Sequence, residues 1–183
     1  MSLKPWKTLR SKTIVDDRWI TIRADTCENE AGIQIDPYYV LDPGEWVHVV
    51  AFNESQDVLL IRQYRHALGE VCIELPCGCV DQGEEPLSAM KRELLEETGG
   101  EAKRWEALPK MAANAARFST WVYPYIALGV KEIQAQQLDD VEEIEFGFYP
   151  ALKVLEMIQQ GEIVQSLHIA SILLAFRQLK LPR

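Results

Sequence analysis

The chain has 183 residues, of which 48% are hydrophobic and 26% are charged. This is the composition of a globular protein with a sizeable core, and it argues against disorder. The 19 basic and 28 acidic residues give a formal net charge of −9. Because nucleic acids and anionic membranes attract positive surfaces, this charge argues against a partner of either kind. This net charge does not exclude a small phosphate-bearing ligand, provided that metal ions and a few arginines make the electrostatic potential positive at its site.

The start of the chain has no apolar run of signal-peptide length, and the apolar stretch 169–176 is too short to span a bilayer. We therefore expect a cytoplasmic protein. The four cysteines, Cys27, Cys72, Cys77 and Cys79, are too few and too clustered for a disulfide scaffold. Because no second cysteine pair and no histidine lie close to Cys77 and Cys79, we expect small buried thiols rather than a zinc site.

Hydrophobic patterning and turn residues predict the elements in chain order. Three short strands come first, and Asp42-Pro43-Gly44 is a strong break after them. A hairpin and a short strand precede a helix that starts at a proline and stops before Gly99; two strands and two helices follow. The predicted strands are 6–15, 19–26, 33–41, 46–52, 58–64, 71–75, 121–130 and 144–148, and the predicted helices are 86–98, 151–160 and 165–179. Mixed strands with few, late helices indicate an α+β fold. We expect a small N-terminal β lobe over 1–43 and the main domain over 44–183.

Acidic residues are concentrated on one predicted helix. Glu93, Glu96 and Glu97 have the spacing i, i+3, i+4, so their carboxylates project from one side of helix 86–98. Carboxylates on one face repel each other, and more strongly in a cleft than in water. The face is therefore either simply solvated, as charged helix faces commonly are, or a platform for Mg²⁺, which prefers hard oxygen ligands.

The flanking residues separate these two interpretations. Gly78 is followed after five residues by Glu84, and after seven more by the run Arg92-Glu93-Leu94-Leu95-Glu96-Glu97-Thr98-Gly99. This pattern resembles the Nudix box in every fixed position. The one departure is Gly100, where the family usually has an aliphatic or small residue.

The resemblance implies a Nudix fold, which is an α/β/α sandwich of mixed sheets, and hydrolysis of a pyrophosphate bond that depends on Mg²⁺, with Mn²⁺ as the alternative ion. Glu93 and Glu97 would be the principal metal ligands. Glu96 would be a third ligand and a catalytic candidate, and the backbone carbonyl of Cys77 would contribute. Of the remaining box residues, Arg92 and Glu84 would form an ion pair that fixes the loop against the helix. Gly78 and Gly99 would permit backbone geometries that a side chain obstructs.

Segments around the box resemble the ADP-ribose pyrophosphatases and related nucleotide-sugar hydrolases. These segments are 59–66 and 74–78, and the N-terminal strands look like the lobe that exchanges between subunits of that subfamily. We therefore expect a homodimer and ADP-ribose as the substrate. The alternatives are another nucleotide sugar, such as GDP-mannose or ADP-glucose, and a Nudix-fold regulator that binds nucleotide without hydrolysis. The presence of every box glutamate argues against the regulator.

Four residues are candidates for substrate binding. Arg62 and Arg65 carry guanidinium groups suited to phosphate oxygens. Residues three apart in a strand face opposite sides, so one arginine is expected to reach the ligand. We favour Arg65 for the phosphate, with an ion pair at the surface as the equal alternative for this side chain. Glu74 lies in the entry to the box. Trp46 would either stack on a base or belong to the core.

A catalytic base is expected from the acidic loop 139–145. Glu142 and Glu143 are the candidates for the base or for a further metal ligand, with Asp140 behind them. The subfamily's proline after the box is absent from 111–119, which leaves Asn114 or Arg117 to read a different substrate group. The three histidines, His48, His66 and His168, are expected to be isolated and structural.

Overall fold

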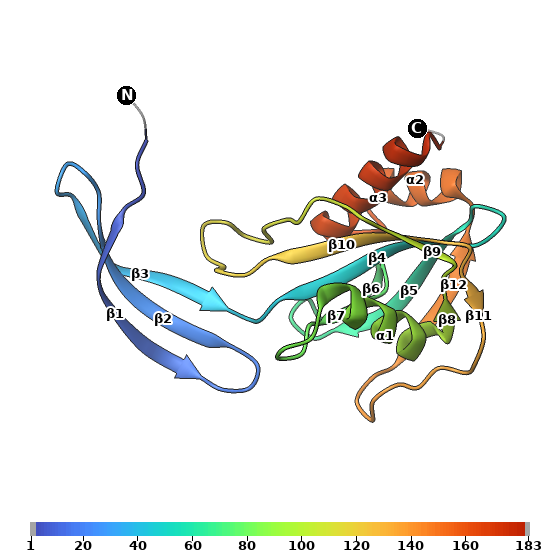
Figure 1. Ribbon diagram of the computed structural model, residues 1–183, viewed down its shortest axis with the longest axis horizontal. Helices are drawn as coiled ribbons and strands as arrows, with labels where there is room; N and C mark the ends of the chain where they lie inside the picture. The colour runs from blue at the N-terminus through green and yellow to red at the C-terminus, as the bar shows by residue number, and fades with distance from the viewer. Residues whose placement is uncertain (1–2, 182–183) are drawn as a thin grey trace. The chain divides into compact units, whose positions relative to one another are not determined.

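The computed structural model describes residues 3–181, which form two compact units (Figure 1). The first unit consists of the described residues up to Glu45 together with Ala112–Trp121, and the second consists of Trp46–Met111 and the described residues from Val122 onward. The sequence predicts a border after residue 43 and assigns 112–121 to the main domain, whereas the structure groups this segment with the first unit. Among residues 3–181, no helix is both long and apolar enough to cross a membrane.

The first unit is a three-stranded antiparallel sheet in the order β1-β2-β3. Its strands are β1 (Lys7–Asp16), β2 (Thr21–Glu28) and β3 (Gln34–Asp42). The segment Ala112–Trp121 pairs with the end of β3, because the Leu41 N–H donates to the Arg117 carbonyl at 2.8 Å and the Ser119 N–H donates to the Leu41 carbonyl at 3.1 Å. Every residue of β1 is exposed.

The second unit is built on a mixed seven-stranded sheet. Its main path runs β12-β5-β4-β10-β9, with β6 paired to β5 and β7 paired to β4. The strands β4 and β10 are parallel, and the other pairs are antiparallel. The strands are β4 (Trp46–Phe52), β5 (Val58–Arg65), β6 (Glu70–Glu74), β7 (Cys77–Cys79), β9 (Arg104–Ala107), β10 (Val122–Leu128) and β12 (Ile144–Tyr149). A separate two-stranded sheet pairs β8 (Gly100–Glu101) with β11 (Lys131–Glu132).

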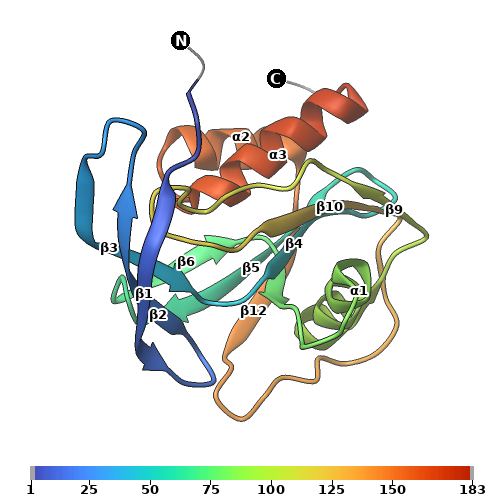
Figure 2. The ribbon, with the colours of Figure 1, turned by 60° about the vertical axis from the view of Figure 1, so that its left-hand side comes forward.

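Helices cover both faces of this sheet, so the predicted α/β/α sandwich is confirmed (Figure 2). Alternate residues of a strand point to opposite faces. Val47 and Val49 of β4 pack in one cluster with Met90 and Leu94 of α1 (Pro86–Thr98). The next residues along, Val50 and Phe52, belong to the other cluster, which holds buried side chains of α2 (Ala151–Gln159) and α3 (Ser166–Leu179). Each fully buried aliphatic side chain contributes about 1.5–3 kcal/mol by leaving water, which fixes α1 on its face of the sheet.

The bounds of α1 match the prediction. Pro86 occupies the first turn, where its missing N–H costs nothing. Gly99 ends the helix in the left-handed region, with φ of 63°, and its N–H donates to the Leu95 carbonyl at 2.8 Å. The short strands β7, β8, β9 and β11 were not predicted.

Candidate active site

The three glutamates of the box lie on α1 but differ in exposure. The side chain of Glu93 is 14% exposed and that of Glu96 is 39% exposed, while Glu97 is buried. Glu97 accepts a hydrogen bond from the Cys77 N–H at 3.0 Å. The helix therefore turns Glu93 and Glu97 inward, toward β7, and leaves Glu96 nearer to solvent.

Arg92 joins four parts of the box. The predicted ion pair is present, with Arg92 Nη2 at 3.0 Å from Glu84 Oε2. A further hydrogen bond runs from Arg92 Nη2 to the Cys79 carbonyl at 3.1 Å. Arg92 Nη1 also donates to Glu93 at 2.8 Å and to Glu96 at 3.1 Å, which the sequence did not predict. The hydrogen bonds to Glu84 and the nearby carboxylates raise the pKa of Arg92 above its ordinary value, so the guanidinium keeps its charge and ties the loop before α1 to the acidic face of the helix.

The two inward-facing carboxylates, Glu93 and Glu97, have raised pKa values. Burial is the main cause that brings the pKa of Glu93 to about 7; Glu96 and Glu142 act in the same direction, and Arg92 opposes them. Burial also raises the pKa of Glu97 well above its ordinary value, with the charges of Glu93 and Glu142 adding to the effect and the Cys77 N–H opposing it. Negative charge is therefore crowded in a poorly solvated place, which a cation would relieve.

Gly78 lies directly against the carboxylate of Glu93. A Cβ atom at Gly78 would stand 2.0 Å from Glu93 Cδ and 2.1 Å from Oε1. In β7, Gly78 pairs with Val47 of β4, so the sheet holds it in this position. The glycine of the box is required here because any side chain would occupy the space of the Glu93 carboxylate.

The donor set fits a hard divalent cation in its chemistry, since it consists of carboxylate oxygens. Within residues 3–181, however, no three or more His, Cys, Asp and Glu side chains are gathered in the arrangement of a metal site. Oxygens of Glu93 and Glu96 face Arg92, and an oxygen of Glu97 faces the Cys77 N–H. The carboxylates of Glu93 and Glu96 would therefore have to turn from Arg92 to hold an ion.

The two candidate arginines face different surroundings. Arg62 is exposed and forms a surface pair, with Nη1 at 2.8 Å from Oε2 of Glu145 on the neighbouring strand β12. Arg65 binds the buried Glu74 through both Nε and Nη2, and its Nη2 lies 3.4 Å from Cys77 Sγ. Arg65 and Glu74 thus form a bidentate pair beside the segment that enters the box, and Arg62 lies apart from it.

The remaining candidates lie in several parts of the chain. Trp46 is half-buried at the start of β4. Burial raises the pKa of the neighbouring Cys79 thiol, and a hydrogen bond with the Trp46 side chain opposes this rise. Asn114 stabilises a turn in the first unit by accepting the Ala116 N–H at 3.2 Å. The Arg117 guanidinium lies 5.7 Å from the centre of the Tyr38 ring.

The prediction that the histidines are isolated is wrong for His48 and His168. His48 and His168 are both buried, with ring centres 4.9 Å apart, and His48 Nε2 lies 2.7 Å from the Ser171 hydroxyl. The Leu75 N–H donates to His168 Nδ1 at 3.2 Å. A weak signal was available, because His48 interrupts an apolar strand and His168 lies one turn before Ile172 on the apolar face of its helix. The prediction of small buried thiols holds for Cys72, whereas Cys27 and Cys77 are half-buried and Cys79 is exposed.

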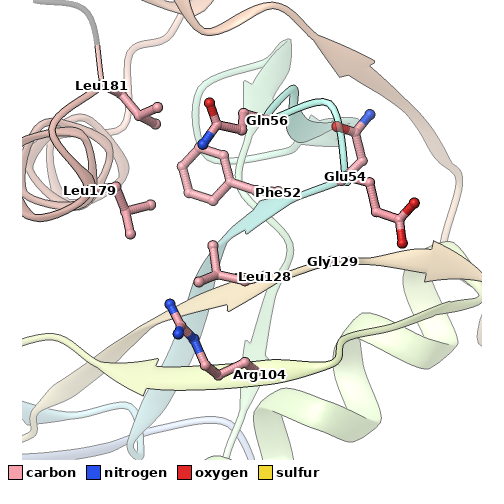
Figure 3. A pocket seen from close by; sticks show the side chains of 9 residues that line it. Phe52, Glu54, Gln56, Arg104, Leu128, Gly129, Leu179 and Leu181 are labelled. Atoms are coloured by element: carbon pink, nitrogen blue, oxygen red, sulfur yellow. The ribbon is translucent and has the colours of Figure 1, made fainter.

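A shallow hollow of about 310 Å³ lies elsewhere in the second unit (Figure 3). Apolar side chains of β4, β10 and the C-terminal segment line it together with polar residues, among them Phe52, Leu128, Leu179, Gln56 and Arg104. It contains none of the residues that the sequence predicts for catalysis, metal binding or substrate binding.

Comparisons with known proteins agree with the fold and the box. The family model described as NUDIX domain matches residues 43–166. A second model, described as nucleoside diphosphate sugar hydrolase N-terminal domain, matches residues 6–41. The first match covers more than half of the chain, so the chain belongs to the NUDIX domain family.

Several relatives and a solved structure are similar to this chain over most of its length. An ADP-ribose pyrophosphatase of Mycobacterium tuberculosis is 29% identical over 175 residues, which are 94% of this chain and 84% of that protein. An ADP-ribose pyrophosphatase of Bacillus subtilis is 29% identical, over 82% of this chain and 83% of the relative, and a methanol dehydrogenase activator of Bacillus methanolicus is 29% identical, over 87% and 86%. A crystal structure of an ADP compounds hydrolase superimposes with a TM-score of 0.87 at 22% identity, covering 98% of this chain and 97% of that one, and it shows the shared fold. The chain is a pyrophosphohydrolase of the Nudix family.

Proposed function

We propose that this hydrolase cleaves the pyrophosphate bond of ADP-ribose, giving AMP and ribose 5-phosphate, in a reaction that depends on Mg²⁺ or Mn²⁺. The observation that carries the metal dependence is the crowding of carboxylates on α1: burial raises the pKa of both Glu93 and Glu97, and the charge of Glu142 acts on each in the same direction. The choice of ADP-ribose is supported by the two ADP-ribose pyrophosphatases that are similar to this chain over most of its length.

Glu93 and Glu97 would hold the metal, with Glu96 as a third ligand and the Cys77 carbonyl as a further one. A divalent ion held by these residues would neutralise charge on pyrophosphate oxygens and lower the pKa of bound water. Arg92 and Glu84 keep the loop before α1 in place through their ion pair, and so orient the metal-binding face rather than react themselves.

Glu142 is the better candidate for the base among the acidic-loop residues. Its charge acts on both Glu93 and Glu97, so it lies close to the carboxylates that would hold the metal. A carboxylate there can take the proton of the attacking water. Glu143 is retained as the alternative, and Asp140 stands behind both.

Arg65 is the candidate for the substrate phosphate. It is held by Glu74, and its side chain remains 38% exposed, so it can present one edge of the guanidinium to an anion while the other edge stays paired. Glu74 would then act by orienting Arg65. Trp46, half-buried at the start of β4, stays a candidate for stacking on the base, and the exposed Arg62 is the weaker phosphate candidate.

The test is incubation of the purified protein with Mg²⁺ or Mn²⁺ and a substrate panel, followed by identification of products by chromatography. The panel contains ADP-ribose, GDP-mannose, ADP-glucose, UDP-glucose, NADH and diadenosine polyphosphates. We expect AMP and ribose 5-phosphate from ADP-ribose at the highest kcat/KM, no turnover with EDTA, and no turnover by Glu97→Gln. Faster cleavage of GDP-mannose or ADP-glucose would replace ADP-ribose with the nucleotide-sugar alternative. Turnover that persists in EDTA would contradict the proposed dependence on a metal ion.

We also propose that the protein is a homodimer in which the first unit packs on a second copy of the chain. Large hydrophobic side chains are exposed in this unit, among them Leu9, Ile14 and Ile35 on the strands and Trp6 and Trp19 beside them. Three strands with so much exposed apolar surface normally have a partner. Sedimentation equilibrium should give twice the mass of one chain. The charged substitution Trp6→Glu and the polar substitution Leu9→Ser should each shift the mass toward that of the monomer. A monomeric wild-type protein at micromolar concentration would contradict the proposal.

A further inference from the structure

The chain segment before the acidic loop is attached to the C-terminal end of α1. The last carbonyls of a helix lack partners within the helix. Here the Gln137 N–H donates to the Glu96 carbonyl at 2.9 Å, and the Ile133 N–H donates to the Gly99 carbonyl at 2.9 Å. The segment 133–137 therefore lies along the last turn of the helix that carries the box glutamates.

One side chain in this segment makes two further bonds. The side-chain amide nitrogen of Gln136 donates to the Glu97 carbonyl at 2.5 Å and to the Ile144 carbonyl at 3.1 Å. Ile144 is the first residue of β12, where the chain leaves the acidic loop. Gln136 is half-buried, so water competes poorly for these bonds. Its amide thus joins the beginning and the end of the loop 137–143 to the backbone of Glu97.

Gly99 makes room for this attachment. A Cβ atom at Gly99 would stand 1.9 Å from the Gln134 carbonyl oxygen, so the segment could not approach α1 if another residue closed the box. Inside the loop, the Glu142 N–H donates to the Asp139 carbonyl at 2.9 Å and the Asp139 N–H donates to Glu142 Oε2 at 3.2 Å. The base of the loop is thus fixed on α1, and its own turn fixes Glu142.

We propose that Gln136 is a positioning residue that holds the loop 137–143 against the end of α1, so that Glu142 faces Glu93 and Glu97. The inference rests on the proposed function in one respect, because it assigns the purpose of the attachment to the placement of Glu142. The side-chain part of the attachment consists of two hydrogen bonds from one amide nitrogen, so a substitution that removes the Gln136 amide removes both.

The experiment compares Gln136→Ala and Gln136→Met with Gln137→Ala. Methionine keeps the length and volume of glutamine without its donors, so it tests the hydrogen bonds where alanine also removes packing. Gln137 reaches Glu96 through its backbone N–H, which alanine retains, and it serves as the matched control. We expect kcat to fall about 100-fold in both Gln136 variants, the size of loss that a displacement of about 1 Å causes, with KM within about threefold of wild type. Gln137→Ala should retain the wild-type kcat.

A double-mutant cycle with Glu142→Gln identifies the residue through which Gln136 acts. If Gln136 positions Glu142, then Gln136→Met should slow Glu142→Gln by less than about threefold, because the group that it positions has already been disabled. Losses that multiply in the double variant would overturn the proposal, and so would a wild-type kcat in Gln136→Met.

Amide hydrogen exchange of residues 137–143, measured without metal or substrate, provides a readout that does not depend on turnover. Exchange in this loop should become at least about tenfold faster in Gln136→Met and stay unchanged in Gln137→Ala, because local opening replaces protected amides. Unchanged exchange in Gln136→Met would overturn the attachment. A wild-type protein that cleaves none of the substrates would instead remove the proposed function, and the exchange experiment would still decide on Gln136.

Discussion

The substitution Gly78→Ala should impair catalysis while leaving the stability of the fold nearly unchanged. The added Cβ would stand 2.0 Å from Glu93 Cδ, whereas ordinary van der Waals contacts begin at 3.4 Å, so the Glu93 carboxylate must retreat by about 1.4 Å. Functional groups need to be held within about 0.5 Å of their productive position, and a displacement of about 1 Å costs roughly 100-fold in rate. We therefore expect kcat/KM to fall at least about 100-fold, close to the loss in Glu93→Gln.

The fold should tolerate the same substitution. Gly78 does not have a positive φ, so alanine can adopt its backbone conformation. The clash involves only the end of the flexible Glu93 side chain. The change in the free energy of unfolding should stay below about 1 kcal/mol, since alanine also restricts the unfolded chain. Urea denaturation measures this change.

Two assays test the prediction for Gly78→Ala. Steady-state kinetics at saturating Mg²⁺ give the loss in rate, and electron paramagnetic resonance of Mn²⁺ gives the ion affinity, which should fall as in Glu93→Gln. The double variant Gly78→Ala/Glu93→Gln should be no slower than the slower single variant. Wild-type rate and Mn²⁺ affinity in Gly78→Ala would refute the reasoning that the Glu93 carboxylate is needed where the structure places it.

Three further predictions concern other features of the second unit. Gly99→Ala should lower the free energy of unfolding by about 1–3 kcal/mol in urea denaturation, because alanine is strained at φ of 63° and its Cβ would stand 1.9 Å from the Gln134 oxygen; an unchanged midpoint would contradict this. Burial lowers the pKa of His168 to about 3 from its ordinary 6.5, so below pH 6.5 the unfolded chain takes up a proton that the folded chain excludes. This contribution to stability is complete above pH 6.5 and should fall by up to about 1.4 kcal/mol per pH unit between pH 6.5 and 3. Over this range, the free energy of unfolding from denaturation should depend less steeply on pH in His168→Asn than in the wild type. An equally steep dependence would contradict the prediction. Glu142→Gln should lower kcat by about 100-fold to 10,000-fold, as expected for loss of a general base, while Glu143→Gln stays within a few-fold of wild type; equal and full activity of both would exclude the loop from catalysis.

Local sequence signals predicted the ends of α1, the common side of its carboxylates, and the ion pair that joins it to the preceding loop. Pro86 and Gly99 mark the ends of α1 because each has a backbone property that acts within one turn. The spacing of Glu93 and Glu97 places both carboxylates on one side of a helix wherever that helix lies. The contact between Arg92 and Glu84 was predictable from the family pattern, because the two residues lie in one short segment.

Long-range contacts were not predictable from the same signals. His48 and His168 meet because α3 packs against β4. Their apolar neighbours in the chain indicate that each lies on a buried face, but not that the two faces meet. The pairing of Gln136 with Glu97 joins a loop to a helix end that lies 39 residues away. The two-residue strands β8 and β11 are likewise defined by their mutual pairing, since so short a segment has no periodicity to detect.

The division of the chain has a practical consequence for engineering. The first unit draws on two separate stretches, and the chain passes from one unit to the other after residues 45, 111 and 121. A truncated protein beginning at residue 46 would keep the whole box, yet the backbone groups of Arg117 and Ser119 would lose their pairing with Leu41. A chimaera that exchanges the N-terminal lobe with that of a relative therefore needs two grafts, and a single crossover near residue 43 would combine mismatched halves of one sheet edge.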